Sequence, residues 1–189
     1  MTEISLGNSA ISERNLGDIN FSVLIEMLSS ECTLTRTNIN GYADKLVDFY
    51  KEPNKDTSTE VAECFRFILF ELLENAAKYS VDMPKKASRI FFSDYNDFFC
   101  LKISNISTKK QASRLMDSAQ EINKATDWDQ LFISKIENQD SLYGQIGLLT
   151  LVKEYETKVI ISVDPGEKEL SNISIETILP KKVLKGDIH

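Results

Sequence analysis

Three polar side chains of different chemistry fall on one strip of a single helical stretch. The segment FELLENAAKYS runs from Phe70 to Ser80 and contains Glu71, Asn75 and Lys78. At about 100° per residue, Asn75 projects about 40° to one side of Glu71 and Lys78 about 20° to the other. A carboxylate, an amide and an ammonium in one narrow strip suit the polar wall of a pocket.

The strip borders the apolar face of the same helix. The apolar side chains centre about 95° from Glu71, and the other charges, Glu63 and Glu74, lie on the far side. The apolar positions are Val61, Cys64, Phe65, Ile68, Leu69, Leu72 and Ala76. Glu71 with Asn75, and Glu74 with Lys78, are also ordinary neighbours four residues apart, which stabilise a helix by roughly 0.2–0.5 kcal/mol. This stretch alone leaves both a pocket wall and simple helix stabilisation open.

A second stretch places two glycines directly before an apolar run. Gly144-Gln145-Ile146-Gly147 precedes Leu148, Leu149, Leu151 and Val152. We expect a glycine-led turn that feeds a helix over residues 144–155. The free N–H groups and the positive dipole end of such a helix can bind an anion. A plain tight turn would have the same sequence.

The first third of the chain reads as mainly helical. Residues 1–17 are either a loose arm or an edge strand, and the apolar spacing of INFSVLIEMLSSEC predicts a helix over Ile19–Cys32. Ile39–Tyr50 is a second amphipathic stretch. Thr57-Ser58-Thr59-Glu60 has the form of a capping box, so it predicts the start of the long helix that carries Glu71, with about six turns.

Strands dominate the second half. Four stretches rich in branched and aromatic residues read as two hairpins with turns at 94–97 and 165–166. They are Ser88–Ser93, Phe98–Ser104, Lys158–Asp164 and Leu170–Leu179. Gln111–Ala125 and Trp128–Asn138 read as polar helices between the hairpins. Helices segregated from antiparallel strands predict an α+β two-layer sandwich, with a mixed, mainly antiparallel sheet covered on one face by helices.

The composition is that of an ordinary globular domain with an acidic balance. The 189 residues are 42% hydrophobic and 27% charged, and 22 Lys+Arg against 29 Asp+Glu give a net charge of −7, which argues against nucleic acid. Cys32, Cys64 and Cys100 are far apart, as expected for buried thiols in a reducing compartment. No apolar stretch approaches the ~20 residues that span a bilayer, so we expect a cytoplasmic protein without a membrane partner.

Together the two polar stretches resemble a known superfamily. ELLENAAKYS is similar to the N box, and GQIGLLTLV to the second glycine box, of the GHKL ATPases and kinases. The similarity is closest to stand-alone members, namely anti-sigma-factor kinases and SiaB-like serine/threonine kinases of bacterial partner switches. The resemblance implies a Bergerat-type fold. It implies a flexible arm over residues 1–16, an ATP-binding domain over 17–180 with a helical ATP lid over 106–143, and a tail over 181–189.

The resemblance also implies roles for single residues. Glu71 would be the catalytic base that orients the attacking hydroxyl or water, Asn75 would ligate Mg²⁺, and Lys78 would lie near the phosphates. The phosphates of ATP would be held by the second glycine box, Gly144, Gln145, Gly147 and Leu148. Phosphoryl transfer requires little more from a protein than such positioning and charge neutralisation.

Two positions depart from the superfamily pattern. The first glycine box has the form D-x-G-x-G in relatives, whereas Ser104–Thr108 reads SNIST here. Asn105 can still accept a hydrogen bond from the adenine amino group through its amide oxygen, and we expect weaker adenine recognition. Gln145 stands where relatives usually carry a smaller residue, so its side chain can crowd the phosphate loop.

Two functions follow from these features. One is a serine/threonine kinase that uses Mg·ATP to phosphorylate a small STAS-type partner, and the other is a binding module that holds a protein partner without ATP turnover. A complete histidine kinase is excluded because the single histidine is His189. The resemblance also leaves room for a homodimer, although nothing in residues 1–50 establishes one. Trp128 and Phe132 predict packing of the lid on the core, with partner contact as the alternative.

Overall fold

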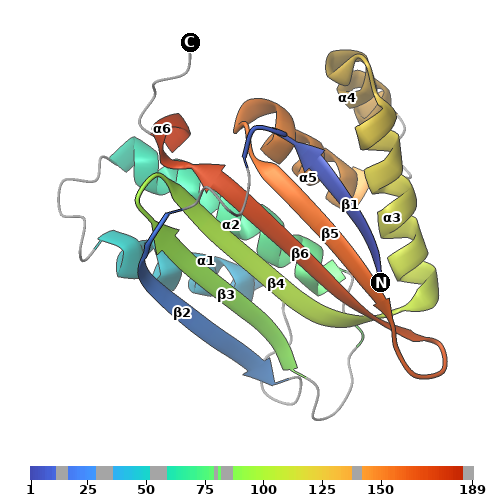
Figure 1. Ribbon diagram of the computed structural model, residues 1–189, viewed down its shortest axis with the longest axis horizontal. Helices are drawn as coiled ribbons and strands as arrows, with labels where there is room; N and C mark the ends of the chain where they lie inside the picture. Colours follow the sequence, from blue (N-terminus) through green and yellow to red (C-terminus); the bar gives the residue numbers. More distant parts are fainter. Residues whose placement is uncertain are drawn as a thin grey trace.

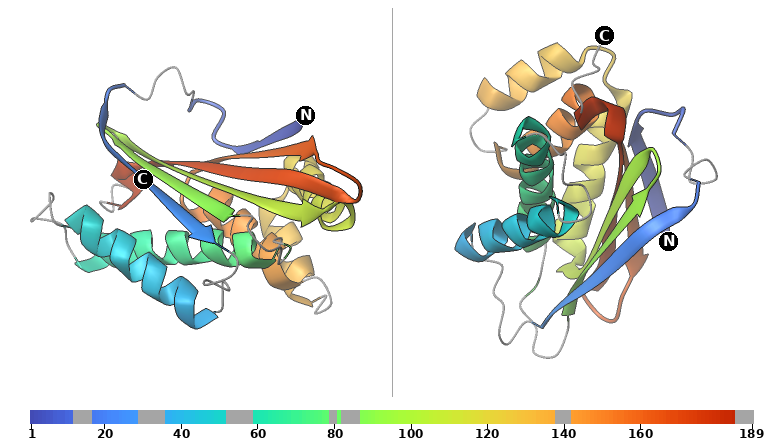
Figure 2. Two further views of the ribbon diagram at one scale, coloured as in Figure 1. Left: turned by 90° about the horizontal axis from the view of Figure 1, so that it is seen from below. Right: turned by 90° about the vertical axis from the view of Figure 1, so that its left-hand side faces the viewer.

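The computed structural model describes residues 1–11, 17–28, 36–51, 59–78, 81, 87–137 and 142–184. Within these ranges the chain forms a six-stranded sheet (Figure 1). The main helices cover one face of this sheet (Figure 2). All neighbouring strands pair antiparallel. The expected α+β two-layer sandwich is therefore confirmed, with a sheet that is antiparallel throughout rather than mixed.

The strand order is β1-β5-β6-β4-β3-β2, so the first two strands of the chain form the two edges. The strands are β1 (Thr2–Gly7), β2 (Ile19–Leu28), β3 (Ala87–Tyr95), β4 (Phe98–Thr108), β5 (Lys158–Pro165) and β6 (Leu170–Pro180). Both predicted hairpins, β3–β4 and β5–β6, are confirmed. The β3–β4 turn consists of Asn96 and Asp97, two residue types that favour tight turns.

Six helices are present in the described ranges. They are α1 (Arg36–Lys51), α2 (Thr59–Lys78), α3 (Lys109–Lys124), α4 (Trp128–Glu137), α5 (Leu142–Glu154) and α6 (Lys181–Leu184). The 20 residues of α2 make about five and a half turns, close to the prediction. Its predicted capping residue, Thr57, lies outside the described residues. None of the described helices combines the length and apolar character needed to cross a membrane.

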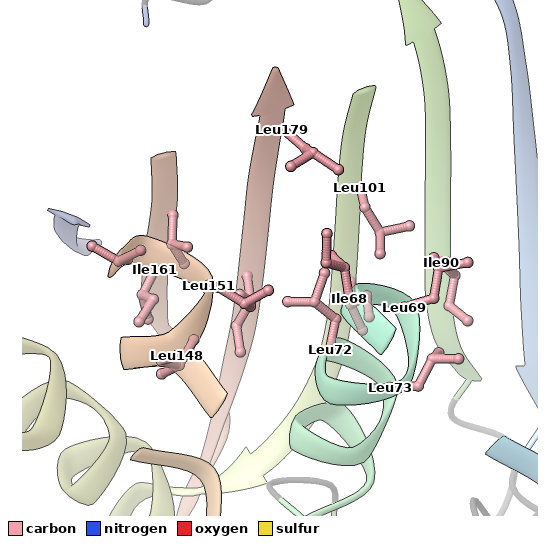
Figure 3. Packing of buried hydrophobic residues seen from close by; sticks show 14 of the residues in the cluster. Ile68, Leu69, Leu72, Leu73, Ile90, Leu101, Leu148, Leu151, Ile161 and Leu179 are labelled. Atoms are coloured by element: carbon pink, nitrogen blue, oxygen red, sulfur yellow. The ribbon is translucent and has the colours of Figure 1, made fainter. Parts of the chain in front are cut away.

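The main core lies between the helices and one face of the sheet. Alternate residues of β4, Phe99, Leu101 and Ile103, face it and are at most 4% exposed. Leu69 and Leu72 of α2 pack against them from the helical layer (Figure 3). Burial of such a side chain contributes about 1.5–3 kcal/mol, so this packing fixes α2 on the sheet. Helix α5 packs beside α2 in the same layer.

The helix predicted from Ile19 is wrong, because residues 19–28 form strand β2. Leu24 pairs with Phe91 of β3, and Glu26 pairs with Arg89. The apolar residues fit a helical period, but they also alternate with polar ones at every second position, with Leu24 and Leu28 as the exceptions. A short apolar run cannot distinguish the two periods. Residues 29–32 lie outside the described part of the chain.

The N-terminal segment is an edge strand rather than a flexible arm. β1 pairs with β5 from Thr2 to Gly7, and Leu6 is 2% exposed in the main core. Gly7 has a φ of 83° and approaches the backbone of Thr157 so closely that a side chain would not fit. The domain therefore begins at its first strand, and residues 12–16 of the predicted arm lie outside the description.

The residues predicted as a lid, 106–143, do not form one inserted unit. Ile106–Thr108 complete β4, and α3 places Leu115 and Ala119, both 0% exposed, in the main core. By contrast α4, all of which is described, has no buried residue. Within the described residues of the predicted lid, α4 is the segment with the surface character expected of a lid.

The predicted C-terminal tail begins as helix α6. Lys181 Nζ forms an ion pair with Asp94 Oδ1 at 2.5 Å and lies 4.7 Å from the centre of the Phe99 ring. Asn20 donates a hydrogen bond to the same oxygen of Asp94 at 3.1 Å. These contacts fasten α6 to the sheet. Residues 185–189 lie outside the described part of the chain.

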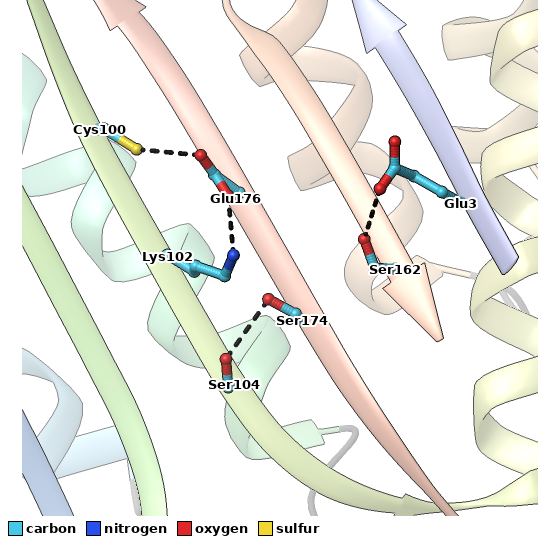
Figure 4. A network of polar contacts seen from close by, with 7 residues as sticks. All are labelled: Glu3, Cys100, Lys102, Ser104, Ser162, Ser174 and Glu176. Carbon is cyan, nitrogen blue, oxygen red and sulfur yellow. Dashed lines mark hydrogen bonds and ion pairs between the residues drawn. The ribbon is translucent and has the colours of Figure 1, made fainter. Parts of the chain in front are cut away.

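The sheet face opposite the main core carries polar contacts between strands (Figure 4). Lys102 donates to one oxygen of Glu176 at 3.0 Å and the thiol of Cys100 donates to the other at 3.4 Å. Ser104 donates to Ser174 at 3.3 Å. This face is therefore polar around Lys102, Ser104, Ser174 and Glu176. A second, smaller apolar cluster of Ile11, Cys100, Ile160 and Ile178 lies beside these residues.

Candidate functional site

Helices α2 and α5 bring Glu71 and Asn75 together at Gly147. A β-carbon built on Gly147 would collide with Glu71 Oε2 and would lie 3.6 Å from Asn75 Nδ2. The two side chains lie one turn apart on α2 and therefore approach the same point of α5. Because Gly147 has no side chain, the Glu71 carboxylate can enter the space between the helices.

Asn75 is the most deeply buried polar group of this site. Its side chain belongs to a residue that is 2% exposed, and Nδ2 has no hydrogen-bond partner among the described residues. A buried polar atom without a partner costs about 1–3 kcal/mol, so such atoms are rare and call for an explanation. A ligand that contacts the Asn75 amide is one explanation that suits the neighbouring carboxylate.

Glu71 is half-buried, and its environment disfavours the charged form. Burial, and in addition the nearby carboxylate of Glu74, raise the pKa of Glu71 above its ordinary value of 4.5. The helical projection placed Glu74 on the far side of α2, but three residues of separation still keep two carboxylates within electrostatic range. Perturbed carboxylates of this kind are common at functional sites.

The predicted glycine-led turn is wrong, because α5 already begins at Leu142. Gly144 and Gly147 lie inside the helix. Only the first four N–H groups of a helix lack an acceptor within it, which here includes Gly144 and Gln145 but not Gly147. Leu148 is 0% exposed and packs in the main core. The N–H groups that α5 leaves without a helical acceptor are therefore those of residues 142–145, two residues earlier than the predicted helix start implies.

Asn105 lies near the C-terminal end of α2, whose last residue is Lys78. Asn105 is 5% exposed and follows Ile103 on the face of β4 that points to the helices. Beyond α2, the N–H of Val81 donates to the carbonyl of Ile106 at 2.8 Å, which holds the end of α2 near Asn105. Lys78 is the last residue of α2, and its side chain lies outside the description, as does that of Gln145.

Helix α4 is held on the surface by aromatic and ionic contacts. Trp128 and Phe132 pack partly buried against the main core, which confirms the predicted packing. Lys153 of α5 forms an ion pair with Asp129 at 2.7 Å and lies 6.0 Å from the centre of the Phe132 ring. Contacts with carboxylates raise the pKa of Lys153, first through Asp129. These contacts position α4 beside α5.

Other sites are less developed in the described part of the chain. It contains no group of three or more His, Cys, Asp or Glu residues that could hold a metal ion. A cavity of about 420 Å³ lies between the N-terminal segment and α6, lined by Asn8, Phe98 and Lys182 among others. It shares no residue with Glu71, Asn75 and Gly147. The candidate site therefore rests on the contact between α2 and α5.

The comparisons with known proteins show a similar fold among the solved structures. No family model and no curated protein sequence matches the chain. The fold is similar to that of a chain in the crystal structure of the SiaB–SiaC complex from Pseudomonas aeruginosa, with a TM-score of 0.62 and 14% sequence identity. The match covers 85% of this chain and 91% of that chain. At this identity the likeness establishes a shared fold.

Proposed function

We propose that this protein is a GHKL-type, ATP-binding regulator of a bacterial partner switch that phosphorylates a serine or threonine of a small STAS-type protein. The observation that carries the proposal is the approach of Glu71 and Asn75 to Gly147, which joins the two sequence boxes at one point. The likeness in fold to a chain of the SiaB–SiaC complex supports it, since that structure is an assembly of two proteins.

The buried amide of Asn75 fits a ligand of Mg²⁺. Nδ2 of Asn75 has no partner among the described residues. If the side-chain amide is flipped, its oxygen takes the position of Nδ2, and no hydrogen bond of Nδ2 is lost. Mg²⁺ takes oxygen ligands and keeps several waters, so one protein oxygen suffices beside the phosphates. The ion would neutralise charge on the triphosphate. Lys78 would add a second positive charge there.

Glu71 is the residue that we assign as the base. The hydroxyl oxygen of the partner attacks the γ-phosphorus of ATP, the bond to ADP breaks, and the hydroxyl proton passes to Glu71. Because burial and Glu74 raise its pKa, Glu71 holds this proton more readily than an exposed glutamate would. The phosphates bind the amides of Gly144 and Gln145, and Asn105 accepts a hydrogen bond from the adenine.

Phosphorylation would change the affinity of the partner through charge. A phosphoserine adds a charge of about −2 and three strong acceptor oxygens. This chain has a net charge of −7, so a phosphorylated partner is repelled by the surface that held it. Release after transfer is the expected direction of the switch.

Thermal unfolding with nucleotide tests the proposal. We expect millimolar Mg·ATP to raise the Tm, because a ligand that binds only the folded state stabilises it, and we expect Asn75→Ala to remove the rise. Asn172→Ala, at an exposed asparagine of β6, is the control and should keep it. Absence of a shift in the unaltered protein, confirmed by calorimetric titration, would contradict ATP binding.

The second candidate is a protein-binding module without catalysis. It is favoured by Asn105 in place of the aspartate of relatives and by the winding of Gly144 and Gly147 into α5. Such a module would bind its partner with the same affinity in the presence and absence of Mg·ATP, and no label would pass from γ-labelled ATP to the partner. Under the kinase proposal, label is transferred by the unaltered protein and lost with Glu71→Gln, while the nucleotide-dependent Tm shift remains.

A further inference from the structure

The cavity of about 420 Å³ lies far from the contact between α2 and α5. Its walls are the segment that follows β1, the turn between β3 and β4, and the start of α6. Phe98, which lines it, is seven residues from Asn105 along β4, a distance of about 23 Å, and the two side chains point to opposite faces of the sheet. The volume falls in the range of roughly 300–1,000 Å³ that is usual for small-molecule sites. The cavity is therefore a separate place where a small ligand fits.

The buried side of the cavity is apolar. Ile11 is 5% exposed and belongs to the smaller apolar cluster, which includes Cys100 on the open face of the sheet (Figure 4). Phe98 packs partly buried against the same cluster. Pro180 of β6 is buried and is the direct neighbour of Phe98 across the strands. Side chains held by a packed cluster form a fixed surface on which an aliphatic group can rest.

The open side of the cavity is polar and contains a carboxylate. Asn8, Asn96 and Asp97 line it. Oδ1 of Asn8 accepts a hydrogen bond from the N–H of Ala10 at 3.0 Å, which holds this side chain in place. Among the described residues, the carboxylate of Asp97 has no ion-pair or hydrogen-bond partner. A negative charge of this kind favours a ligand that carries a positive group.

Lys182 supplies the opposite charge close to Asp97. The N–H of Lys181 donates to the carbonyl of Asp97 at 2.8 Å, so Lys182 directly follows the residue that is bound to Asp97. The ammonium of Lys182 forms an ion pair with Glu156 at 3.2 Å, and both side chains are exposed, by 62% and 43%. Such a pair contributes about 0–1 kcal/mol. Lys182 can therefore exchange Glu156 for a carboxylate of a ligand at little cost.

We propose that this cavity binds a free α-amino acid with an apolar side chain. The ammonium group of the ligand binds Asp97, its carboxylate binds Lys182, and its side chain lies against Ile11 and Phe98. A simple anion would be repelled by Asp97 and a simple cation by Lys182, so the two charges together favour a zwitterion. Both contacts are charge-assisted hydrogen bonds, which are stronger than neutral ones. The inference does not depend on nucleotide binding or catalysis.

Calorimetric titration of the full chain with L-leucine tests the proposal. We expect saturable binding, and we expect isocaproate, which lacks the ammonium group, and isoamylamine, which lacks the carboxylate, to bind about tenfold more weakly or worse, because each loses one charged contact. Leucinamide represents the amino end of a peptide and should lose affinity as isoamylamine does. No saturable binding of L-leucine at millimolar concentration, or equal affinity for all four compounds, would overturn the proposal.

Substitutions at exposed positions locate the site. Asp97→Asn and Lys182→Gln should each weaken L-leucine binding about tenfold, whereas the matched changes Asp117→Asn and Lys110→Gln, at exposed residues of α3, should leave it unchanged. Glu156→Gln should strengthen binding by up to about fivefold, because it frees Lys182 from its ion pair. Circular dichroism checks that each variant folds. Unchanged affinity in both the Asp97 and the Lys182 variants would place the amino acid elsewhere and overturn the proposal.

Discussion

At the scale of single residues, the packing of Glu71 between α2 and α5 couples its charge to stability. The pKa of Glu71 in the folded protein lies above the ordinary value of 4.5, which applies to the unfolded chain. At a pH between these two pKa values, the folded protein binds more protons than the unfolded chain. Stability contributed by the protonated form is therefore lost as pH rises through this window. We expect Glu71→Gln to raise the Tm at neutral pH and to raise it less near pH 4, measured by thermal unfolding across that range.

The matched variant is Glu63→Gln, at an exposed glutamate of the same helix. It should show no comparable dependence on pH. A Glu71→Gln effect that is the same at every pH would contradict the assignment of the effect to the charge of Glu71.

Gly147 gives a second test at the same scale. A methyl group there would displace Glu71 Oε2, the end of a flexible side chain, so we expect Gly147→Ala to cancel the gain of alanine over glycine in a helix and to destabilise the fold by up to about 1 kcal/mol. Gly41→Ala is the control, because a side chain at Gly41 of α1 meets no atom of the described residues within 4 Å. It should stabilise the helix by about 0.5–1 kcal/mol. Urea denaturation measures both, and equal effects would contradict the contact.

At the scale of elements, α4 is held less firmly than its neighbour α3, which has buried residues. Helix α4 has no buried residue. Its two ion pairs, Asp129 with Lys153 of α5 at 2.7 Å and Lys135 with Glu121 of α3 at 2.6 Å, involve exposed carboxylates. Such pairs contribute about 0–1 kcal/mol each. We expect Lys153→Met to increase hydrogen exchange in residues 128–137 without changing it in α3. Lys102→Met, which removes an ion pair on the open face, should change neither.

The helices and strands were predicted best where the apolar residues repeat with a single period. The helix α2 and the two hairpins were recognisable because their apolar spacing, capping residues and turn residues agreed. β2 was missed because its apolar residues fit two periods, and its pairing with β3, distant in the chain, decided between them. The start of α5 was misplaced because glycine suggests a turn, whereas packing between α2 and α5 keeps Gly147 helical.

At the scale of the whole molecule, the candidate site could be predicted only as two separate stretches. The strip of Glu71 and Asn75 was visible from helical geometry, and Gly147 was visible as a glycine near an apolar run. The Glu71 carboxylate fills the space left by Gly147 because of the way that two helices pack on the sheet. No local sequence pattern contains this information. The effect of Glu74 on Glu71 was missed for a different reason, since a helical wheel ignores the range of electrostatic forces.

An ion pair and a hydrogen bond on the carboxylate of Asp94 join three distant parts of the chain, and they give a prediction at this scale. Asp94 and Lys181 have side chains that are 4% and 18% exposed, and Asn20 donates to the same carboxylate. We expect Asp94→Ala to destabilise the fold by about 3–5 kcal/mol, because it leaves a buried charge without its partner. The double variant Asp94→Ala/Lys181→Met should recover part of this loss in urea denaturation. If the two substitutions were additive, the pair would not be coupled.

The position of β1 has a consequence for biosynthesis. β1 leaves the ribosome before the other described strands, yet its one neighbour in the sheet is β5, which is made only after residue 157. Contacts between such remote segments form late, because a long loop must close first. During translation β1 therefore has no strand to pair with until β5 has been made, and this edge of the sheet is completed late.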